Sequence, residues 1–430
     1  MSIGTRIRYY RLQKKLSLED LAKDITTVPY LSSIENNEHT PPIELLSQLC
    51  DKLEIPFMTY QNNELELLFQ EWNRCLLMND TENSDACYKK ITEKISESND
   101  IFAVMTYHIY LIRYHLLHNE LEEAQDIINF FIPLQNDMPD ILKYSYQKFR
   151  GNYYYIKGQY LEAERFFKDA KNYLISVKEL YNLEKADLFY MYGLTLGRLT
   201  KNTLSIFHME EALSLFQQSY HMRRCTDCHL MLGVIYRRMQ DYKEAEKHYN
   251  FARQLAYSLD FKDIKIKVEN NLGYLMAEQG KSEEAIGHYL KSFGQSDFSM
   301  TEDKINTIIN IIKEYHKIGF KEQVEKWLHE GLELLHSKEQ YSEIYKEQMI
   351  ELKFYQYTVN DYPSGFESFI LNEAIPYFES IKRYQRVVLL AKTLGDYYQK
   401  RNEYKSAATS FAIANSAYEK IINFLRRNPK

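Results

Sequence analysis

The segment HMRRCTDCH, residues 221–229, holds the residue types that bind metals or carry out thiol chemistry. His221, Cys225 and His229 recur every four residues, so a helix would bring them to one face, and Cys228 completes a CxxC with Cys225. A structural zinc site needs four ligands, however, and no second CxxC occurs in the chain. Because cysteine also packs well as a small buried hydrophobe, we favour packing over a metal or redox role.

Motifs for catalysis are missing from the sequence. It contains no GxxxxGK[ST] loop, no GxGxxG and no GxSxG. HExxH is missing too, since the pair His329 and Glu330 is followed by Glu333 where a second histidine would be needed. We therefore expect a protein that is not an enzyme, with no catalytic residues, no metal and no cofactor.

Composition and charge favour a binding protein. The chain has 430 residues, of which 45% are hydrophobic and 27% charged, and its net charge of -6 argues against coating nucleic acid throughout. Residues 1–23 are locally basic, with six Lys or Arg against two acids. The sequence has neither an N-terminal apolar stretch nor a run of 18 uncharged apolar residues, so we expect a cytoplasmic protein without a membrane span.

A fixed spacing of small and large residues recurs along most of the chain. In residues 267–292 a Gly, a Met, an Ala, a Tyr and a Ser are spaced 3, 9, 4 and 3 apart, starting at Gly273, and the same spacing starts at Gly151, Gly233 and Gly395. This pattern is typical of tetratricopeptide repeats, in which two helices meet through small residues.

Taking the first small position of each repeat as its register, we predict an all-α fold with about nine repeats in a right-handed superhelix. The expected register positions are Arg74, Ile112, Gly151, Gly193, Gly233, Gly273, Ile312, Phe354 and Gly395. The repeat at Phe354 has Phe366 where Ala is expected, so we predict a different local geometry or a subunit contact over residues 360–376.

The start of the chain predicts short helices around a small core. A basic helix over residues 5–15 precedes Ser17, a suitable cap for a helix beginning at Leu18, and a later helix over residues 43–53 follows Pro42. Residues 16–56 resemble a helix-turn-helix domain of the lambda-repressor type. Such a domain places the start of its second helix against base edges in the major groove, although a protein-binding role is the alternative.

The residues expected to contact DNA lie in and before that second helix. It offers hydroxyls, one ring and a rigid turn but no Arg, Asn or Gln for bidentate reading of a base. The candidates for base and phosphate contacts are Arg6, Arg11, Lys14, Lys23, Thr27, Pro29, Tyr30, Ser32 and Ser33.

The domain order predicted is a helix-turn-helix domain over residues 1–58, a linker or first repeat helix over 59–70, and a repeat domain over 71–430. This combination resembles the peptide-pheromone receptors of Gram-positive bacteria, the Rap, NprR, PlcR, Rgg and PrgX class, and most closely the NprR and PlcR branch. The resemblance implies a short signalling peptide held in the groove of the repeat domain. Some members of the class then change dimer arrangement and DNA affinity, and others sequester a response regulator.

Side-chain amides on the first helix of a repeat are suited to hold an extended peptide, because an amide both donates and accepts a hydrogen bond. Asn271 and Asn310 each stand two residues before a register position, where family members commonly hold the peptide backbone. Each could equally be a helix-packing amide. Further groove candidates are Asn270, Lys267, Asn152, Tyr155, Tyr236, Arg237 and Lys313, while Arg113, Lys148 and Arg198 are candidates to receive a peptide carboxylate.

Two functions remain open from the sequence. The favoured one is a quorum-sensing regulator that binds a double-stranded DNA operator as a homodimer under control of a peptide. The alternative is a repeat scaffold that sequesters a response regulator or another protein under peptide control.

Overall fold

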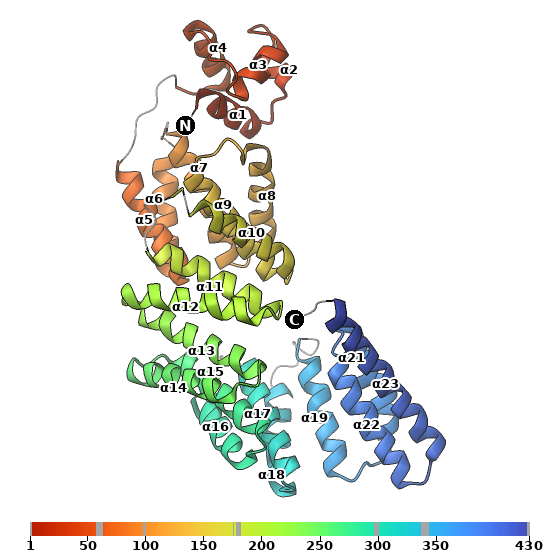
Figure 1. Cartoon of the computed structure of the whole chain (residues 1–430). Helices are drawn as coiled ribbons and strands as arrows, with labels where there is room; N and C mark the ends of the chain where they lie inside the picture. The colour runs from red at the N-terminus through yellow and green to blue at the C-terminus, as the bar shows by residue number, and fades with distance from the viewer. Residues whose placement is uncertain are drawn as a thin grey trace. The chain divides into compact units, whose positions relative to one another are not determined.

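The computed structural model describes residues 2–56, 63–96, 98, 100–174, 176–177, 182–295, 301–336 and 344–427. In these ranges the regular secondary structure is entirely helical, as predicted (Figure 1). The chain forms two compact units, Met1–Tyr220 and His221–Lys430. No helix in the described ranges is both long and apolar enough to cross a bilayer.

The first unit begins with four short helices around their own core. They are α1 (Ile3–Gln13), α2 (Leu18–Ala22), α3 (Val28–Glu35) and α4 (Ile43–Leu53). Their shared core contains Ile7, Leu31 and Leu49. Ser17 caps α2 as predicted, in a reciprocal capping box with Asp20.

The turn after α3 is shaped by Asn37 and Gly4. Asn37 adopts the left-handed conformation with a φ of 62°, which asparagine tolerates better than most residues. Gly4 lies so close to this turn that an added Cβ would stand 2.0 Å from the carbonyl oxygen of Ile34. The helix-turn-helix geometry therefore depends on a backbone approach that only glycine allows.

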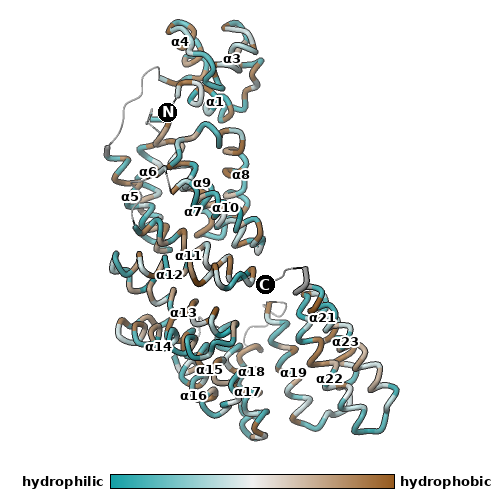
Figure 2. The backbone as a smooth tube through the Cα atoms, viewed as in Figure 1, coloured by the Kyte–Doolittle hydropathy of each residue, from teal (hydrophilic) through white to brown (hydrophobic). Residues whose placement is uncertain are grey.

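Helix pairs account for the rest of the described chain. Hydrophobic and hydrophilic residues alternate along these helices in both units (Figure 2), as expected of helices that pack against one another. Four pairs belong to the first unit: α5 (Asn63–Met78) with α6 (Thr81–Ile95), α7 (Ile101–Leu117) with α8 (Leu121–Phe131), α9 (Asp140–Ile156) with α10 (Tyr160–Tyr173), and α11 (Asn182–Arg198) with α12 (Asn202–Gln218).

The second unit contains five pairs. They are α13 (Met222–Arg238) with α14 (Tyr242–Ser258), α15 (Lys262–Glu278) with α16 (Ser282–Gln295), α17 (Thr301–Lys317) with α18 (Lys321–His336), α19 (Lys346–Val359) with α20 (Phe366–Phe369) and α21 (Ile375–Ser380), and α22 (Tyr384–Lys400) with α23 (Tyr404–Arg427). The described residues thus contain the predicted nine repeats, and every predicted register position falls in the first helix of its pair.

The eighth pair departs from the others, as its sequence predicts. Between α20 and α21 the chain forms a π-helical turn, η3 (Ile370–Ala374). Phe366, which replaces the expected Ala, is 1% exposed and lies against the rings of Tyr362 and Tyr397. The prediction of a different local geometry is confirmed, and the companion idea of a subunit contact stays a prediction.

Contact between the two helices of a pair explains why the same spacing of glycine and aromatic residues recurs along this chain. An added Cβ on Gly273 would stand 2.4 Å from the ring of Tyr289, and one on Gly233 would stand 2.5 Å from Tyr249. Because no real Cβ contact is that short, a side chain at either position would force the helices apart.

We expect Gly273→Ala to destabilise the second unit by about 1–3 kcal/mol through overpacking against Tyr289. Gly287→Ala is the matched control, because Gly287 lies in α16 with nothing within 4 Å of an added Cβ. That change should stabilise by about 0.5–1 kcal/mol through helix propensity. Urea unfolding followed by Trp327 fluorescence in a Trp72→Phe background measures both. A stabilised Gly273→Ala protein would contradict the packing argument.

Candidate DNA-binding domain and ligand face

The second helix of the helix-turn-helix, α3, begins with an open N-terminus. Thr27 is its N-cap residue, yet its hydroxyl makes no capping hydrogen bond, and both Thr27 and Pro29 are exposed. Tyr30, Ser32 and Ser33 are half-buried, and the Ser33 hydroxyl donates to the carbonyl of Tyr30 at 2.8 Å. A helix N-terminus with a free hydroxyl is suited to a phosphate oxygen.

Two of the lysines predicted to contact DNA are exposed. Lys23 ends α2, four residues before Thr27, whereas the ammonium of Lys14 pairs with the carboxylate of Glu54. Asp20 on α2 has a lowered pKa because it accepts hydrogen bonds from the side chain and backbone of Ser17. Lys23 is therefore the lysine best placed to act together with the start of α3.

Two arginines predicted to contact DNA lie inside the domain instead. Arg11 is buried, its guanidinium donates to both oxygens of Glu35 at 2.7 Å, and it also donates to the carbonyl of Leu16 at 2.9 Å. Arg6 is 8% exposed and donates to the carbonyl of Pro56. Since their donors are turned inward, we leave Arg6 and Arg11 out of the DNA interface.

Two of the residues predicted to line the peptide groove bridge neighbouring first helices. Asn310 on α17 is 4% exposed and donates to the hydroxyl of Tyr274 on α15 at 2.9 Å. Asn270 on α15 donates to Thr307 on α17 at 3.0 Å, and its own side-chain oxygen is buried without a hydrogen-bond partner. For these two residues the helix-packing alternative fits better than direct contact with a ligand.

Asn271 is half-buried and has two partners within the protein. Its amide nitrogen donates to the carbonyl of Lys267, one turn back on α15, at 2.8 Å, and its amide oxygen accepts from the hydroxyl of Tyr249 at 3.5 Å. Lys267 is exposed and lies 3.9 Å from Asp263. Arg237 on α13 pairs with Glu278 on α15, so polar contacts also connect these two neighbouring first helices.

The remaining candidates are spread over both units. Tyr236 is stacked on His248, with ring centroids 5.4 Å apart. In the first unit, Asn152 on α9 is 3% exposed and its side-chain oxygen has no hydrogen-bond partner, while Tyr155 is half-buried. Arg113 on α7 donates to Asn79.

The three cations predicted to receive a peptide carboxylate have protein partners. Lys148 is fully buried, with its ammonium 2.6 Å from Glu184 and 2.9 Å from Asp187, so it cannot meet a ligand. The pKa of Arg198 is raised by its hydrogen bond to Tyr155. The presence of Lys148, Arg198 and Arg113 is therefore better explained by their contacts within the protein than by ligand binding.

The thiols of the HMRRCTDCH segment are buried in the fifth repeat, while His221 and His229 are half-buried, and they do not surround a common centre. Nδ1 of His229 lies 3.0 Å from Nδ1 of His248, and burial lowers the pKa of His229 to about 4. Burial raises the pKa of the Cys225 thiol to about 11 and also raises that of the Cys228 thiol. Within the described ranges no three His, Cys, Asp or Glu side chains lie together as metal ligands.

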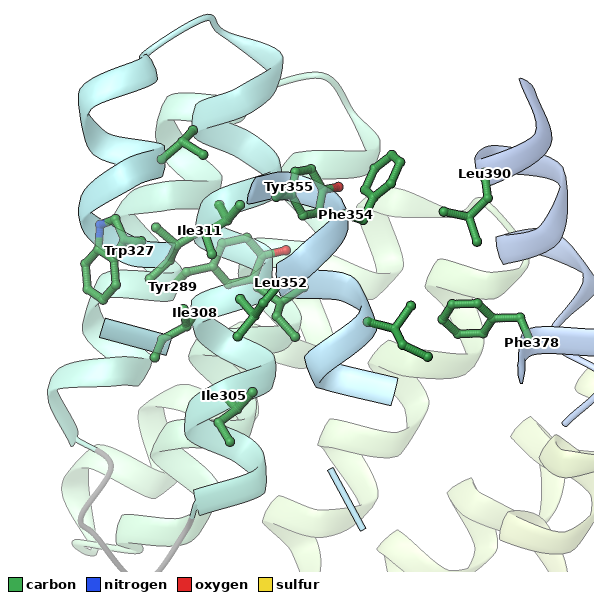
Figure 3. Packing of buried hydrophobic residues seen from close by; sticks show 14 of the residues in the cluster. Tyr289, Ile305, Ile308, Ile311, Trp327, Leu352, Phe354, Tyr355, Phe378 and Leu390 are labelled. Atoms are coloured by element: carbon green, nitrogen blue, oxygen red, sulfur yellow. The ribbon is translucent and has the colours of Figure 1, made fainter. Parts of the chain in front are cut away.

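A cavity of about 810 Å³ opens between α17, α19 and α22 in the second unit. Figure 3 shows Phe354 and Tyr355 on α19, with the ring of Phe354 directed toward α22, the helix that carries Leu390. The lining residues are Lys313, His316, Lys317, Phe354, Tyr355, Thr358, Tyr362, Arg386, Leu389, Thr393, Asp396, Gln399 and Lys400.

Of this lining, the sequence predicted only Lys313 as a ligand residue. The signal that could have pointed here is Phe354 itself, a bulky residue at a register position that is glycine in five other repeats. A volume of this size is typical of pockets that hold small ligands.

Comparison with known proteins finds similarity in both the helix-turn-helix domain and the repeats. Residues 7–58 match the helix-turn-helix family and residues 226–294 match the tetratricopeptide repeat family. Over 406 residues the chain is 29% identical to the transcriptional activator NprA of Geobacillus stearothermophilus, covering 94% of this chain and 100% of that protein. The chain is thus similar in sequence to this regulator, and more distantly to Rap proteins. The regulatory protein RapD of Bacillus subtilis (strain 168) is 23% identical over 71% of this chain and 84% of its own length.

Solved structures agree on the fold. The apo form of the quorum sensor NprR from B. thuringiensis superimposes with a TM-score of 0.71 at 16% identity, covering 83% of this chain and 99% of that one. NprR in complex with its cognate peptide NprX superimposes with a TM-score of 0.59 at 17% identity, over 85% of this chain and 99% of that one. The chain therefore has the repeat fold of the NprR and Rap regulators, preceded by a helix-turn-helix domain.

Proposed function

We propose that this protein is a quorum-sensing transcription regulator that binds an operator as a homodimer and a short peptide on the first-helix face of its repeats. The observation that carries the proposal is the joining of a helix-turn-helix with an open α3 N-terminus to nine repeats of the NprR fold. Full-length similarity to a protein named as a transcriptional activator favours DNA control.

DNA binding would use the cationic surface beside α3. Thr27 and Lys23 can meet phosphates, and Pro29, Tyr30 and Ser32 can meet base edges. Because no Arg, Asn or Gln stands among them, direct reading of bases would be weak, and affinity would rest mainly on phosphates and on paired half-sites.

Titration of the full-length protein onto DNA from upstream of its own gene, at two salt concentrations, tests the proposal. We expect a sequence-selective complex whose affinity falls with salt. Lys23→Glu should weaken it on all sequences and reduce the slope against log salt by about 1. Lys89→Glu on α6, exposed and remote from α3, is the control and should leave affinity unchanged.

The alternative function, sequestration of a response regulator, is favoured by the similarity to RapD. It predicts a stable complex with a response-regulator domain that the peptide dissolves, and no selective complex with DNA. Absence of any salt-dependent, selective DNA complex in the titration would reject the first function and leave the second.

A further inference from the structure

The cavity between α17, α19 and α22 carries an excess of positive charge. Lys313, Lys317, Arg386 and Lys400 line it against a single acid, Asp396. The carboxylates paired with these cations, Glu351 and Glu314, still leave one cation in excess.

Glu351 pairs with two cations at different distances. Nε of Arg386 lies 2.7 Å from one of its oxygens, which is a good charge-assisted hydrogen bond. Nζ of Lys313 lies 3.4 Å from the other oxygen, beyond the usual length of such a bond. An ammonium has three donors, and Lys313 directs its side chain, 20% exposed, into the cavity.

This weak pairing leaves the charge of Lys313 poorly compensated. Burial lowers the pKa of Lys313 below its usual range, although Glu351 acts in the opposite direction. A second carboxylate beside the ammonium would offset that cost, whereas a ligand cation would add to it.

The wall next to Lys313 is apolar. Phe354 and Tyr355 form one side, and Leu389, which is 41% exposed, faces them from α22. A peptide carboxylate that reached Lys313 would therefore bring the peptide side chain next to it into contact with this apolar wall.

We propose that this cavity binds a carboxylate of the ligand peptide, held by the ammonium of Lys313, with the adjoining residue packed on Phe354 and Leu389. The inference rests on the proposed peptide-receptor function and adds the chemistry of the ligand. The carboxylate is either the free C-terminus of the peptide or an Asp or Glu side chain.

Four pools of random heptapeptides distinguish these sources. The first has a free C-terminus and contains Asp and Glu, and the second is the same but amidated at the C-terminus. The third has a free C-terminus but no Asp or Glu, and the fourth lacks both kinds of carboxylate. Each pool is passed over immobilised full-length protein, and the strongest binders are measured by calorimetry. We expect binders from the pool lacking both carboxylates to be at least about tenfold weaker, a loss typical of one charge-assisted bond.

Variants of Lys313 test the acceptor. Lys313→Met should remove the preference for carboxylates, Lys313→Arg should keep it, and the exposed Lys321→Met on α18 should leave it unchanged. Melting curves of the free variants show that each is folded.

The outcomes separate the two proposals. Peptides that bind the wild type with no preference for a carboxylate, or that bind Lys313→Met equally well, would overturn the inference and leave the receptor function intact. No binding from any pool would overturn both. If amidation alone abolishes binding the group is the C-terminus, and if omission of Asp and Glu alone does so it is a side chain.

Discussion

Replacing Lys148 by Met is expected to lower the free energy of unfolding of the first unit by about 3–5 kcal/mol, the cost of leaving buried charge without its partner. Lys148 on α9 is fully buried between Glu184 and Asp187 of α11. Burial acts to lower the pKa of Lys148, but the two carboxylates more than offset this and raise it.

Neighbouring polar groups make the loss hard to relieve. Glu184 also accepts from Asn73 of α5 at 2.7 Å and from the hydroxyl of Tyr144 at 3.1 Å, so three first helices meet at this carboxylate. Met has nearly the volume of Lys but no charge, and it leaves two acids facing each other in a dry interior. One of the two carboxylates must then take up a proton or be reached by water, and both changes destabilise the packing around it.

The measurement is urea unfolding followed by Trp72, which is buried in the first unit, in a Trp327→Phe background. Lys143→Met is the control, because Lys143 lies on the same helix with only a 3.8 Å surface pair to Asp140 and should cost less than about 1 kcal/mol. Adding Glu184→Gln and Asp187→Asn to Lys148→Met should restore part of the loss. A Lys148→Met protein as stable as wild type would contradict this account.

The repeats and the helix-turn-helix could be predicted from the sequence because both rest on local, periodic features. Gly273 and Tyr289 are separated by a fixed number of residues, and their contact recurs wherever that spacing does. Ser17 and Asp20 cap α2 within a single turn. Such features need no knowledge of distant parts of the chain.

The site could be predicted only in part, because the partner of a polar side chain is decided by tertiary packing. Arg11 and Lys14 look alike on a basic segment, yet the pair of Arg11 with Glu35 is buried and the pair of Lys14 with Glu54 lies at the surface. Asn310 has the residue type and the position expected of a ligand contact, but the next first helix supplies Tyr274 to its amide. The cavity beside Phe354 depends on three helices at once.

Replacing Tyr9 by Ala is expected to detach α1 from the repeats while leaving the helix-turn-helix folded. The two faces of α1 belong to different cores. Ile7 packs in the core of α1–α4, whereas Tyr9, fully buried, packs with Met105, Ile109 and Phe131 of the second repeat.

Polar contacts support this docking. The hydroxyl of Tyr9 lies 3.1 Å from Nδ1 of His108, and Arg8 pairs with Asp137, just beyond α8, at 3.1 Å. Loss of a buried aromatic ring costs about 3–5 kcal/mol, and here it falls on the contact between α1 and the repeats. Tyr9→Phe, which removes only the hydroxyl, should cost about 0.5–1.5 kcal/mol.

Hydrogen exchange and DNA titration measure the result together. In Tyr9→Ala, exchange should rise in α7 and in the short helix η1 (Ile132–Leu134), and should stay unchanged in α4. DNA affinity without peptide should be kept, because α3 lies apart from Tyr9 in the packing of the domain. The effect of peptide on DNA affinity should shrink, since α1 contributes to both cores and can pass a change in the repeats to the helix-turn-helix. Faster exchange in α4 would instead mean that Tyr9 supports the fold of the DNA-binding domain itself, and full peptide response in Tyr9→Ala would mean that coupling follows another route.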